Sequence, residues 1–334
     1  MQNTNEQYDK IVGACKNVFI KKNTDYGTAW RVLRTNYFIV LFICILHTTL
    51  SKYICLQINK KMFTLTLNKK EILFKQPVVM GILNATPDSF FAASRTQNID
   101  AALFAAEKMI VEGATFIDIG GQSTRPQSEL IAVGEELNRV LPIIETIHKH
   151  FPETYISIDT YNAIVAKKAV EVGASLVNDI GGGSLDEKMF ETIAELDVPY
   201  ICMHIKGTPQ TMNEHTNYTN VVNEVYDYFV NKIDTADKLG IKDFIIDIGF
   251  GFAKTTKQNF ELIKNLQFFK SLQKPLLIGV SRKSSIYKTL NITPQEALNG
   301  TTVLNTIALQ NGAAILRVHD VKEAIEAVKL CGVF

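Results

Sequence analysis

Three acidic or amide side chains, Asp159, Asn178 and Asp247, each stand at the end of a short apolar run. A carboxylate can accept two N–H bonds side by side, and an asparagine can both donate and accept. Together, these groups could hydrogen-bond the edge of a flat heterocycle that carries donors and acceptors, such as an aminopyrimidinone. For Asp159, capping of the helix expected after it is the alternative interpretation.

Basic side chains stand near the ends of other apolar runs or in the segments after them: Arg125, Lys283, Arg317 and His319. Arginine suits bidentate contact with phosphate, and a histidine could donate a hydrogen bond to an anionic leaving group. The sequence therefore indicates that an anionic group binds beside the heterocycle. No triad-like pattern of Ser, His and Asp points to an enzyme nucleophile.

Asn84 directly follows the apolar run 78–83, and the Thr-Pro-Asp-Ser segment that comes soon after it favours a solvent-facing loop. Mg²⁺ prefers oxygen ligands, keeps bound waters and takes further ligands from substrate phosphates. Anionic phosphates beside Asn84 would therefore suit Mg²⁺. No HxH motif, HExxH motif or cluster of Cys and His predicts a tightly held transition metal.

Two glycine-rich segments could let the backbone approach a ligand closely: residues 249–251 and residues 181–183. The glycine triplet at 181–183 could alternatively bind phosphate at the start of a helix. A turn that binds no ligand is the simpler interpretation of the same three residues.

Eight compact apolar runs, each followed by a helical pattern, would position these side chains. Near-continuous Val, Ile and Leu are typical of strands covered on both faces. The pattern predicts an α/β fold, a (β/α)8 TIM barrel, in which the carboxyl ends of the strands converge on one mouth. A doubly wound open sheet is the alternative, but the first strand-to-helix turn lacks GxGxxG. The expected strands are 78–83, 115–119, 155–158, 176–178, 199–203, 244–246, 276–279 and 314–318, and the expected helices are 99–112, 134–150, 162–172, 186–196, 218–239, 258–270, 294–310 and 321–330.

Glycines follow several of the expected helices, at Gly113, Gly173, Gly240 and Gly312. A glycine in this position predicts a left-handed turn that ends the helix. Ahead of the barrel, residues 63–74 alternate between apolar and polar side chains, which predicts a short N-terminal hairpin.

Residues 1–61 differ in character from the regular remainder of the chain. We expect an additional N-terminal helical extension here, helical or poorly ordered and outside the barrel that residues 62–334 form. Translation from Met62 is the alternative. Residues 37–58 contain an apolar run, but polar side chains interrupt it short of the roughly 20 apolar residues that a membrane span needs, so no membrane attachment is expected.

The composition is that of an ordinary soluble enzyme, 46% hydrophobic and 21% charged with a net charge of +1. No basic run with interleaved aromatic residues predicts nucleic-acid binding. The five cysteines include no CxxC pair, and their odd number argues against a disulfide framework. A reducing compartment and a cytoplasmic location are therefore expected.

From about Phe63 to its end, the chain resembles the dihydropteroate synthase family of folate biosynthesis. The matching motifs occur in order and span the whole expected barrel, so they are jointly specific although each alone is weak. They are MGILNATPDSF (80–90), FIDIGGQSTRP (116–126), ISIDT (156–160), VNDIGGG (177–183), ICMHIKGTPQTM (201–212), FIIDIGFGFAK (244–254), IGVSRKS (278–284) and ILRVHDV (315–321).

The resemblance implies a transferase that condenses 6-hydroxymethyl-7,8-dihydropterin diphosphate with 4-aminobenzoate, uses Mg²⁺, is a sulfonamide target and forms a homodimer. It implies that Asp159, Lys283, Arg317 and His319 carry the chemistry. The implied pterin contacts are Asp159, Asn178, Met203, Asp247, Lys283 and Arg317; the implied diphosphate contacts are Asn84, Thr124, Arg125, Arg317 and His319; and the implied aminobenzoate contacts are Phe90, Pro126, Phe252 and Ser284, with Mg²⁺ beside Asn84.

The sequence departs from the family pattern in two loops. Gln122 stands where the family has glutamate, Gln127 stands where it has glycine, and residues 91–95 lack the common Ser-Asp-Gly-Gly. These departures bear on loop orientation and closure more than on the chemistry.

Two rival functions share the expected barrel. A pterin-dependent methyltetrahydrofolate–corrinoid methyltransferase would share the Asp and Asn contacts but would not need Lys283, Arg317 and His319. A non-catalytic pterin-binding paralogue would be expected to lack one of Asn84, Asp159, Lys283, Arg317 or His319, and all five are present.

Overall fold

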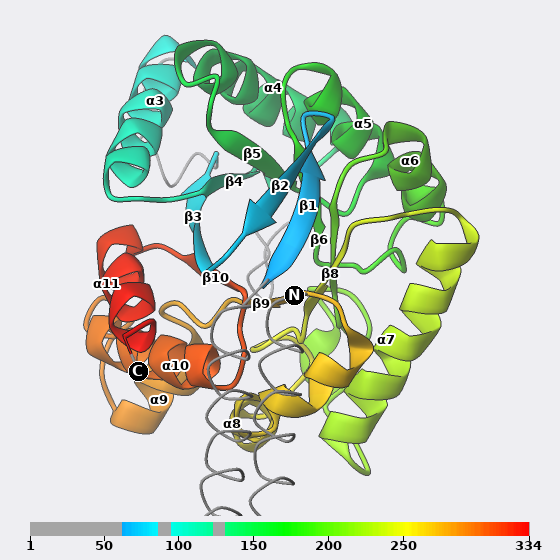
Figure 1. The fold of residues 1–334 in the computed structure, drawn as a ribbon, viewed down its shortest axis with the longest axis vertical. Helices are drawn as coiled ribbons and strands as arrows, with labels where there is room; N and C mark the ends of the chain where they lie inside the picture. The colour runs from blue at the N-terminus through cyan, green and yellow to red at the C-terminus, as the bar shows by residue number, and fades with distance from the viewer. Residues whose placement is uncertain (1–61, 86–94, 123–130, 334) are drawn as a thin grey trace, which may run out of the picture. The chain divides into compact units, whose positions relative to one another are not determined.

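Eight parallel strands close into a barrel in the order β10-β3-β4-β5-β6-β7-β8-β9, with the first and last strands of the order paired (Figure 1). The computed structural model describes residues 62–85, 95–122 and 131–333. Closure confirms the predicted TIM barrel and excludes the open doubly wound sheet. The strands are β3 (Val78–Asn84), β4 (Phe116–Gly120), β5 (Tyr155–Asp159), β6 (Leu176–Asp179), β7 (Tyr200–Met203), β8 (Phe244–Asp247), β9 (Leu276–Ile278) and β10 (Ile315–Val318).

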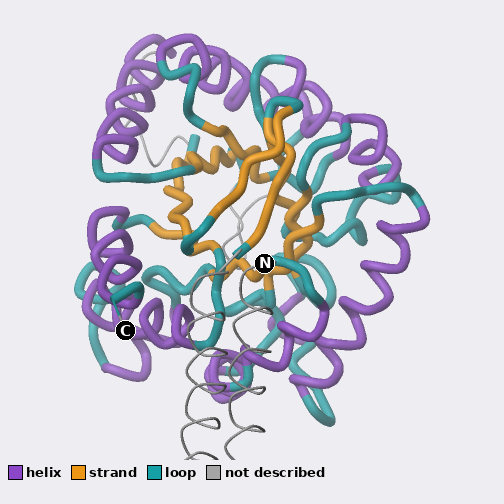
Figure 2. The backbone as a smooth tube through the Cα atoms, in the orientation of Figure 1, coloured by secondary structure: helices purple, strands orange, loops and turns teal. Residues whose placement is uncertain are grey.

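Helices surround the strands as an outer ring (Figure 2). Each of the eight predicted helical stretches corresponds to a helix. They are α3 (Arg95–Val111), α4 (Val133–His150), α5 (Ala163–Glu171), α6 (Met189–Leu196), α7 (Val221–Lys238), α8 (Thr256–Lys264), α10 (Leu298–Gln310) and α11 (Val321–Cys331), with a further helix α9 (Ser284–Leu290) and two 3-10 segments, η1 (Met212–Glu214) and η2 (Leu266–Leu272).

Three details differ from the prediction. The short helix α9 was not predicted, because seven residues carry too little periodicity. Helix α10 begins at Leu298 rather than at Pro294, since the carbonyls of Pro294 and Gln295 accept hydrogen bonds from Arg282. Helix α8 ends at Lys264, where the Asn265 side chain donates to the Glu261 carbonyl, and the chain continues as η2.

The predicted hairpin is confirmed as strands β1 (Phe63–Leu67) and β2 (Lys70–Phe74), which pair antiparallel. Asn68 and Lys69 both have positive φ, 50° and 63°, as a tight two-residue hairpin turn requires. The hairpin packs its apolar face against residues at the amino ends of the barrel strands, among them Phe116, Leu176 and Ile315. It is also fixed to the barrel through the Thr66 amide, which donates to Asp243 at 2.8 Å.

Side chains facing the barrel interior change from apolar to polar along the strands. Phe116, Leu176 and Ile315 pack with the hairpin, whereas their neighbours Ile117, Val177 and Leu316 pack in the cluster that includes the helices. Because strand side chains alternate between faces, the residue two positions after each interior apolar residue also faces inward. Those positions are Asp118, Asn178 and Arg317. The interior is therefore apolar at the hairpin end and polar at the carboxyl end.

The predicted helix-ending glycines are confirmed. Gly113, Gly173, Gly240 and Gly312 have φ between 78° and 126°, the left-handed region that glycine adopts at little cost. In the part of the chain that the structure describes, no helix is long and apolar enough to cross a membrane. Residues 37–58 and the rest of the predicted extension lie outside the described residues.

Candidate active site

Arg317 joins several strands at the carboxyl end of the barrel. Its Nε donates to Asp118 Oδ2 at 2.6 Å, and its Nη2 donates to Asp159 Oδ2 at 2.5 Å. Asn178 Nδ2 donates to the same oxygen of Asp118 at 2.9 Å. One network thus connects β4, β5, β6 and β10, and it brings together three of the predicted site residues.

Asp118 is a member of this network to which the sequence alone gave no role. It is fully buried, and its carboxylate is shared by Asn178 and Arg317. Its position two residues after the interior-facing Phe116 was the available signal. A partner 199 positions away along the chain leaves no local pattern in the sequence.

A second group of residues lies around Lys283. The Lys283 ammonium donates to the Phe250 carbonyl and lies 4.4 Å from the centroid of the Phe252 ring. Asp247 accepts a hydrogen bond from the Gly249 amide at 2.8 Å, and its charge interacts with that of Lys283. Gly249 has φ of 67°, and a Cβ there would lie 2.0 Å from the His204 carbonyl oxygen, so this close turn requires glycine.

Burial perturbs the ionisation of both groups. It raises the pKa of Asp159 to about 7, with Arg317 opposing the shift. It raises the pKa of Asp247 and lowers the pKa of Lys283 to about 8, with each of these two groups opposing the shift of the other. Burial alone would lower the pKa of Arg317, but Asp118 and Asp159 raise it, so this arginine stays charged. Several perturbed groups in one place mark a functional site.

Two buried carboxylate oxygens in the network have no partner among the described residues: Oδ1 of Asp118 and Oδ1 of Asp159. An unpaired buried acceptor costs about 1–3 kcal/mol. A ligand with N–H groups could satisfy these oxygens. A donor-rich edge would fit this network, and the heterocycle expected at Asp159, Asn178 and Asp247 stays a prediction.

The remaining predicted residues are found as follows. Met203 and Phe252 belong to one buried apolar cluster, Ser284 begins α9, and Asn84 is exposed at the end of β3. His319 directly follows β10, and its ring contacts Ser281. Phe90, Thr124, Arg125 and Pro126 lie outside the described residues, as does Gln127.

Two alternatives from the sequence are excluded. Asp159 does not cap a helix, because Asn162 is the N-cap residue of α5 and the Ala163 amide donates to Asp186 at 2.8 Å. The glycine triplet is not a phosphate site, because the carboxylate of Asp179 accepts from the amides of residues 181 and 183 at 2.6 and 2.7 Å.

The buried side chain of Lys254, which is 8% exposed, stabilises the loop that bears Phe250 and Phe252. Its ammonium donates to the carbonyls of Gly249 and Phe252 at 3.0 and 2.9 Å and contacts His204 Nδ1 at 2.9 Å. Burial lowers the pKa values of both Lys254 and His204.

Replacement of Lys254 by methionine is expected to lower the free energy of unfolding by about 3 kcal/mol, because several buried acceptors lose their donor. If Phe252 contacts a substrate, as the resemblance implies, the KM for that substrate should rise as well. Urea unfolding and steady-state kinetics measure the two effects. Lys242→Met, at an exposed lysine paired with Asp197 at 2.8 Å, is the control and should leave both nearly unchanged. Equal behaviour of the two variants would contradict the role of Lys254.

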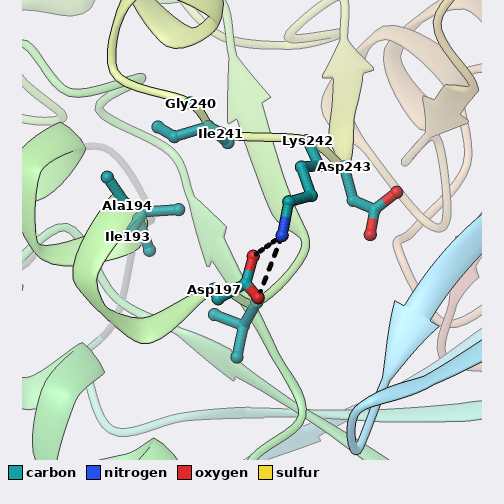
Figure 3. Close-up of a pocket in the computed structure, with 8 residues that line it drawn as sticks. Ile193, Ala194, Asp197, Gly240, Ile241, Lys242 and Asp243 are labelled. Atoms are coloured by element: carbon teal, nitrogen blue, oxygen red, sulfur yellow. Dashed lines mark hydrogen bonds and ion pairs between the residues drawn. The ribbon is translucent and has the colours of Figure 1, made fainter.

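The pocket in Figure 3 lies at the other end of the barrel, beside Asp243, which immediately precedes β8. Its volume is about 10 Å³, room for about one water molecule. It is therefore no substrate site. Its lining residues are Ile193, Ala194, Asp197, Val198, Gly240, Ile241, Lys242 and Asp243.

A closed parallel barrel with its ionisable side chains gathered at the carboxyl ends of the strands defines the class of protein, a TIM-barrel enzyme. Comparison with known proteins narrows this class. A profile described as "Pterin binding enzyme" matches residues 80–319. Dihydropteroate synthase of Escherichia coli K12 is 43% identical over 257 residues, which cover 76% of this chain and 90% of the relative. The Bacillus subtilis enzyme of the same name is 40% identical over 258 residues, 77% of this chain and 88% of the relative.

Solved structures of dihydropteroate synthases are also similar to this chain. Yersinia pestis dihydropteroate synthase, in a sulfonamide drug complex, matches with a TM-score of 0.75 and 38% identity over 81% of this chain and 98% of that one. The Xanthomonas albilineans enzyme with 4-aminobenzoic acid matches with a TM-score of 0.74 and 35% identity, over 80% of this chain and 96% of that one. The chain belongs to the pterin-binding enzyme family and, within it, to the dihydropteroate synthases, which are transferases.

Proposed function

We propose that this site condenses 6-hydroxymethyl-7,8-dihydropterin diphosphate with 4-aminobenzoate, giving 7,8-dihydropteroate and diphosphate for folate biosynthesis. The observation that carries the proposal is the network in which Arg317 binds Asp118 and Asp159 while one oxygen of each carboxylate stays unpaired. A pterin offers N–H groups to such oxygens. Asn178, Asp247 and Lys283 would complete its polar contacts, and Met203 would pack against its ring.

The chemistry needs no enzyme nucleophile. The C–O bond of the pterin methylene breaks with both electrons going to the diphosphate, and positive charge spreads over the electron-rich ring. The buried carboxylate of Asp159 stabilises that charge, and Arg317 and His319 stabilise the leaving anion. The amine of aminobenzoate then attacks the methylene carbon, and loss of the amine proton completes the product.

We propose Mg²⁺ as the cofactor, with the Asn84 side-chain oxygen as its protein ligand. Among the described residues, no group of three or more His, Cys, Asp or Glu side chains could hold a metal. Asn84 is exposed at the end of β3, so a single amide oxygen fits an ion that takes its other ligands from water and phosphate. When bound, the ion would neutralise charge on the diphosphate. Thr124 and Arg125 would contact the same anion.

We propose that Phe252 and Ser284, with Phe90 and Pro126, form the aminobenzoate pocket. The Phe252 ring is nearly buried and offers an apolar face beside Lys283. The Xanthomonas albilineans structure with 4-aminobenzoic acid and the Yersinia pestis sulfonamide complex support this substrate class. Sulfonamides, which resemble aminobenzoate in shape, would compete for the pocket.

The test uses the full-length protein with the pterin diphosphate, Mg²⁺ and labelled 4-aminobenzoate. Labelled dihydropteroate and one equivalent of diphosphate are the expected products, and a sulfonamide should inhibit competitively against aminobenzoate. Omission of Mg²⁺, with chelator added, should lower turnover. Absence of labelled product under all these conditions would overturn the assignment of substrates.

We also propose that the barrel, residues 62–334, is the catalytic domain and that residues 1–61 form a separate extension. The protein would act in the cytoplasm as a homodimer. Light scattering coupled to size-exclusion chromatography measures the mass directly. A mass equal to the single-chain 37.4 kDa at micromolar concentration would contradict the dimer.

A further inference from the structure

Ser281 and His319 lie beyond the carboxyl ends of two adjacent strands. Strands β9 and β10 pair with Ile315 opposite Leu277 and Leu316 opposite Ile278, so the segments that follow them run side by side. The His319 amide donates to Ser281 Oγ at 3.2 Å, and the same Oγ lies 3.0 Å from His319 Nδ1. Ser281 is only 5% exposed, so solvent contributes little to these bonds.

The two contacts together determine which ring nitrogen carries the proton. A serine hydroxyl has one hydrogen to donate and can accept through its lone pairs. The His319 amide already donates to Ser281 Oγ. Across the described residues, Nδ1 of His319 is the acceptor within reach of the Ser281 hydrogen. If Nδ1 were protonated, it would donate to the oxygen and leave the buried hydroxyl hydrogen unbonded, which is unfavourable.

We propose that Ser281 is a positioning residue that holds His319 in the tautomer with the proton on Nε2. His319 then offers a neutral N–H donor to the diphosphate and does so without having to gain a proton. The proposal deepens the function proposed above and rests on it for the identity of the anion. The tautomer is argued from the two Ser281 contacts and needs no assumption about the substrate.

An ion pair braces the same two segments. Arg282 donates to both carboxylate oxygens of Asp320, at 2.9 and 2.8 Å, and its backbone amide donates to Thr301 at 3.0 Å. Arg282 follows Ser281, and Asp320 follows His319. The bidentate pair therefore joins the two backbone segments one residue beyond the serine–histidine contact and helps to hold Ser281 and His319 in place. Arg282 also has φ of 54°, a left-handed conformation that the surrounding contacts must hold in place.

The test reads the tautomer directly in the free, full-length protein. Nitrogen-15 histidine labelling and two-bond ¹H–¹⁵N correlation distinguish the two neutral tautomers and the imidazolium, and His319→Gln assigns the resonances. Wild-type protein should show His319 with the proton on Nε2 alone. Ser281→Ala should give a mixture of tautomers, and Ser281→Thr, which keeps the hydroxyl, should restore the wild-type pattern.

Function gives a second, separate readout. Ser281→Ala should weaken the binding of inorganic diphosphate about fivefold, measured by calorimetry, and should lower kcat about tenfold with less effect on KM. Ser175→Ala removes another buried hydroxyl, one that donates to the Ile156 carbonyl at 3.2 Å near the start of β6, and should change neither value.

Three outcomes would overturn the proposal. They are a wild-type spectrum with the proton on Nδ1, a wild-type imidazolium at neutral pH, and a Ser281→Ala spectrum identical to that of the wild type. The wild-type spectrum decides the matter even if the alanine variant fails to fold. Because it needs no substrate, an error in the proposed reaction would leave this result unaffected.

Discussion

Replacement of Asp159 by asparagine is expected to lower kcat about a thousandfold. The change keeps the size of the side chain and removes the negative charge that we place beside the developing pterin cation. Asp159 is 7% exposed and paired with Arg317, so its charge acts with little screening by water. Steady-state kinetics with saturating aminobenzoate measures the loss, and circular dichroism verifies the fold.

The matched control is Asp179→Asn. Asp179 ends the next strand and is also buried with a raised pKa, but its carboxylate accepts from Tyr200 and from the glycine loop instead of from Arg317. This variant should lose stability and keep its turnover within a few fold. Gln122→Ala, outside the network, should also lose far less activity than Asp159→Asn. Similar kinetics in all three variants would refute the role of Asp159.

Replacement of Arg317 by methionine is expected to lower the free energy of unfolding by about 3–5 kcal/mol at neutral pH and to abolish measurable turnover. The change leaves Asp118 and Asp159 buried without their cation. Without Arg317, the pKa of Asp159 should rise further above its unfolded value. In the wild type this pKa is already about 7, so below that pH Asp159 is protonated in both proteins and adds no difference between them. Above pH 7 the wild-type group ionises while that of the variant keeps its proton, so the deficit should be nearly constant at pH 5 and 6 and grow from pH 7 to pH 8.

Urea unfolding at pH 5, 6, 7 and 8 measures the effect. Arg317→Lys keeps the charge but cannot bind the two carboxylates through a planar fork. It should recover most of the stability and little of the activity. A deficit in Arg317→Met that does not change with pH would show that lost packing, rather than uncompensated charge, causes it.

The sequence predicted most of the fold because each strand and helix carries its own local signal. The eight apolar runs are buried on both faces, and the glycine after several helices adopts the left-handed turn expected of it. Asp159, Asn178 and Asp247 could be predicted to lie near one another because each stands at or next to the end of a strand, and topology brings strand ends together. Helix α9 was missed, since seven residues that follow a site loop show no helical period.

The contacts within the site could not be predicted in the same way. Asp118 and Arg317 are far apart in sequence, and nothing local indicates which carboxylates an arginine will bind. Lys254 ends the motif FIIDIGFGFAK (244–254), but its burial beneath the loop of residues 249–252 depends on backbone geometry. The position of Ser281 relative to His319 depends on the register of β9 and β10.

Gln122, a departure from the family pattern, keeps a structural contact. Its Oε1 accepts a hydrogen bond from the Ile131 amide at 3.0 Å, which joins the two ends of the segment 123–130. A glutamate oxygen would accept the same bond. Gln122 therefore keeps this hydrogen bond although it has lost a charge, and the orientation of the loop, on which the departure bears, lies outside the described residues.

The ion-paired side chains of Asp118, Asp159 and Arg317 serve the proposed catalysis and contribute little net stability to the fold. Buried ion pairs of this kind are often replaced by apolar side chains of similar volume with equal or greater resistance to unfolding. Replacement of Asp118, Asp159 and Arg317 together by apolar side chains would therefore give a barrel that resists unfolding equally well or better but has no catalytic activity. Efforts to make this enzyme withstand heat should therefore begin at the outer helices and leave the mouth as it is.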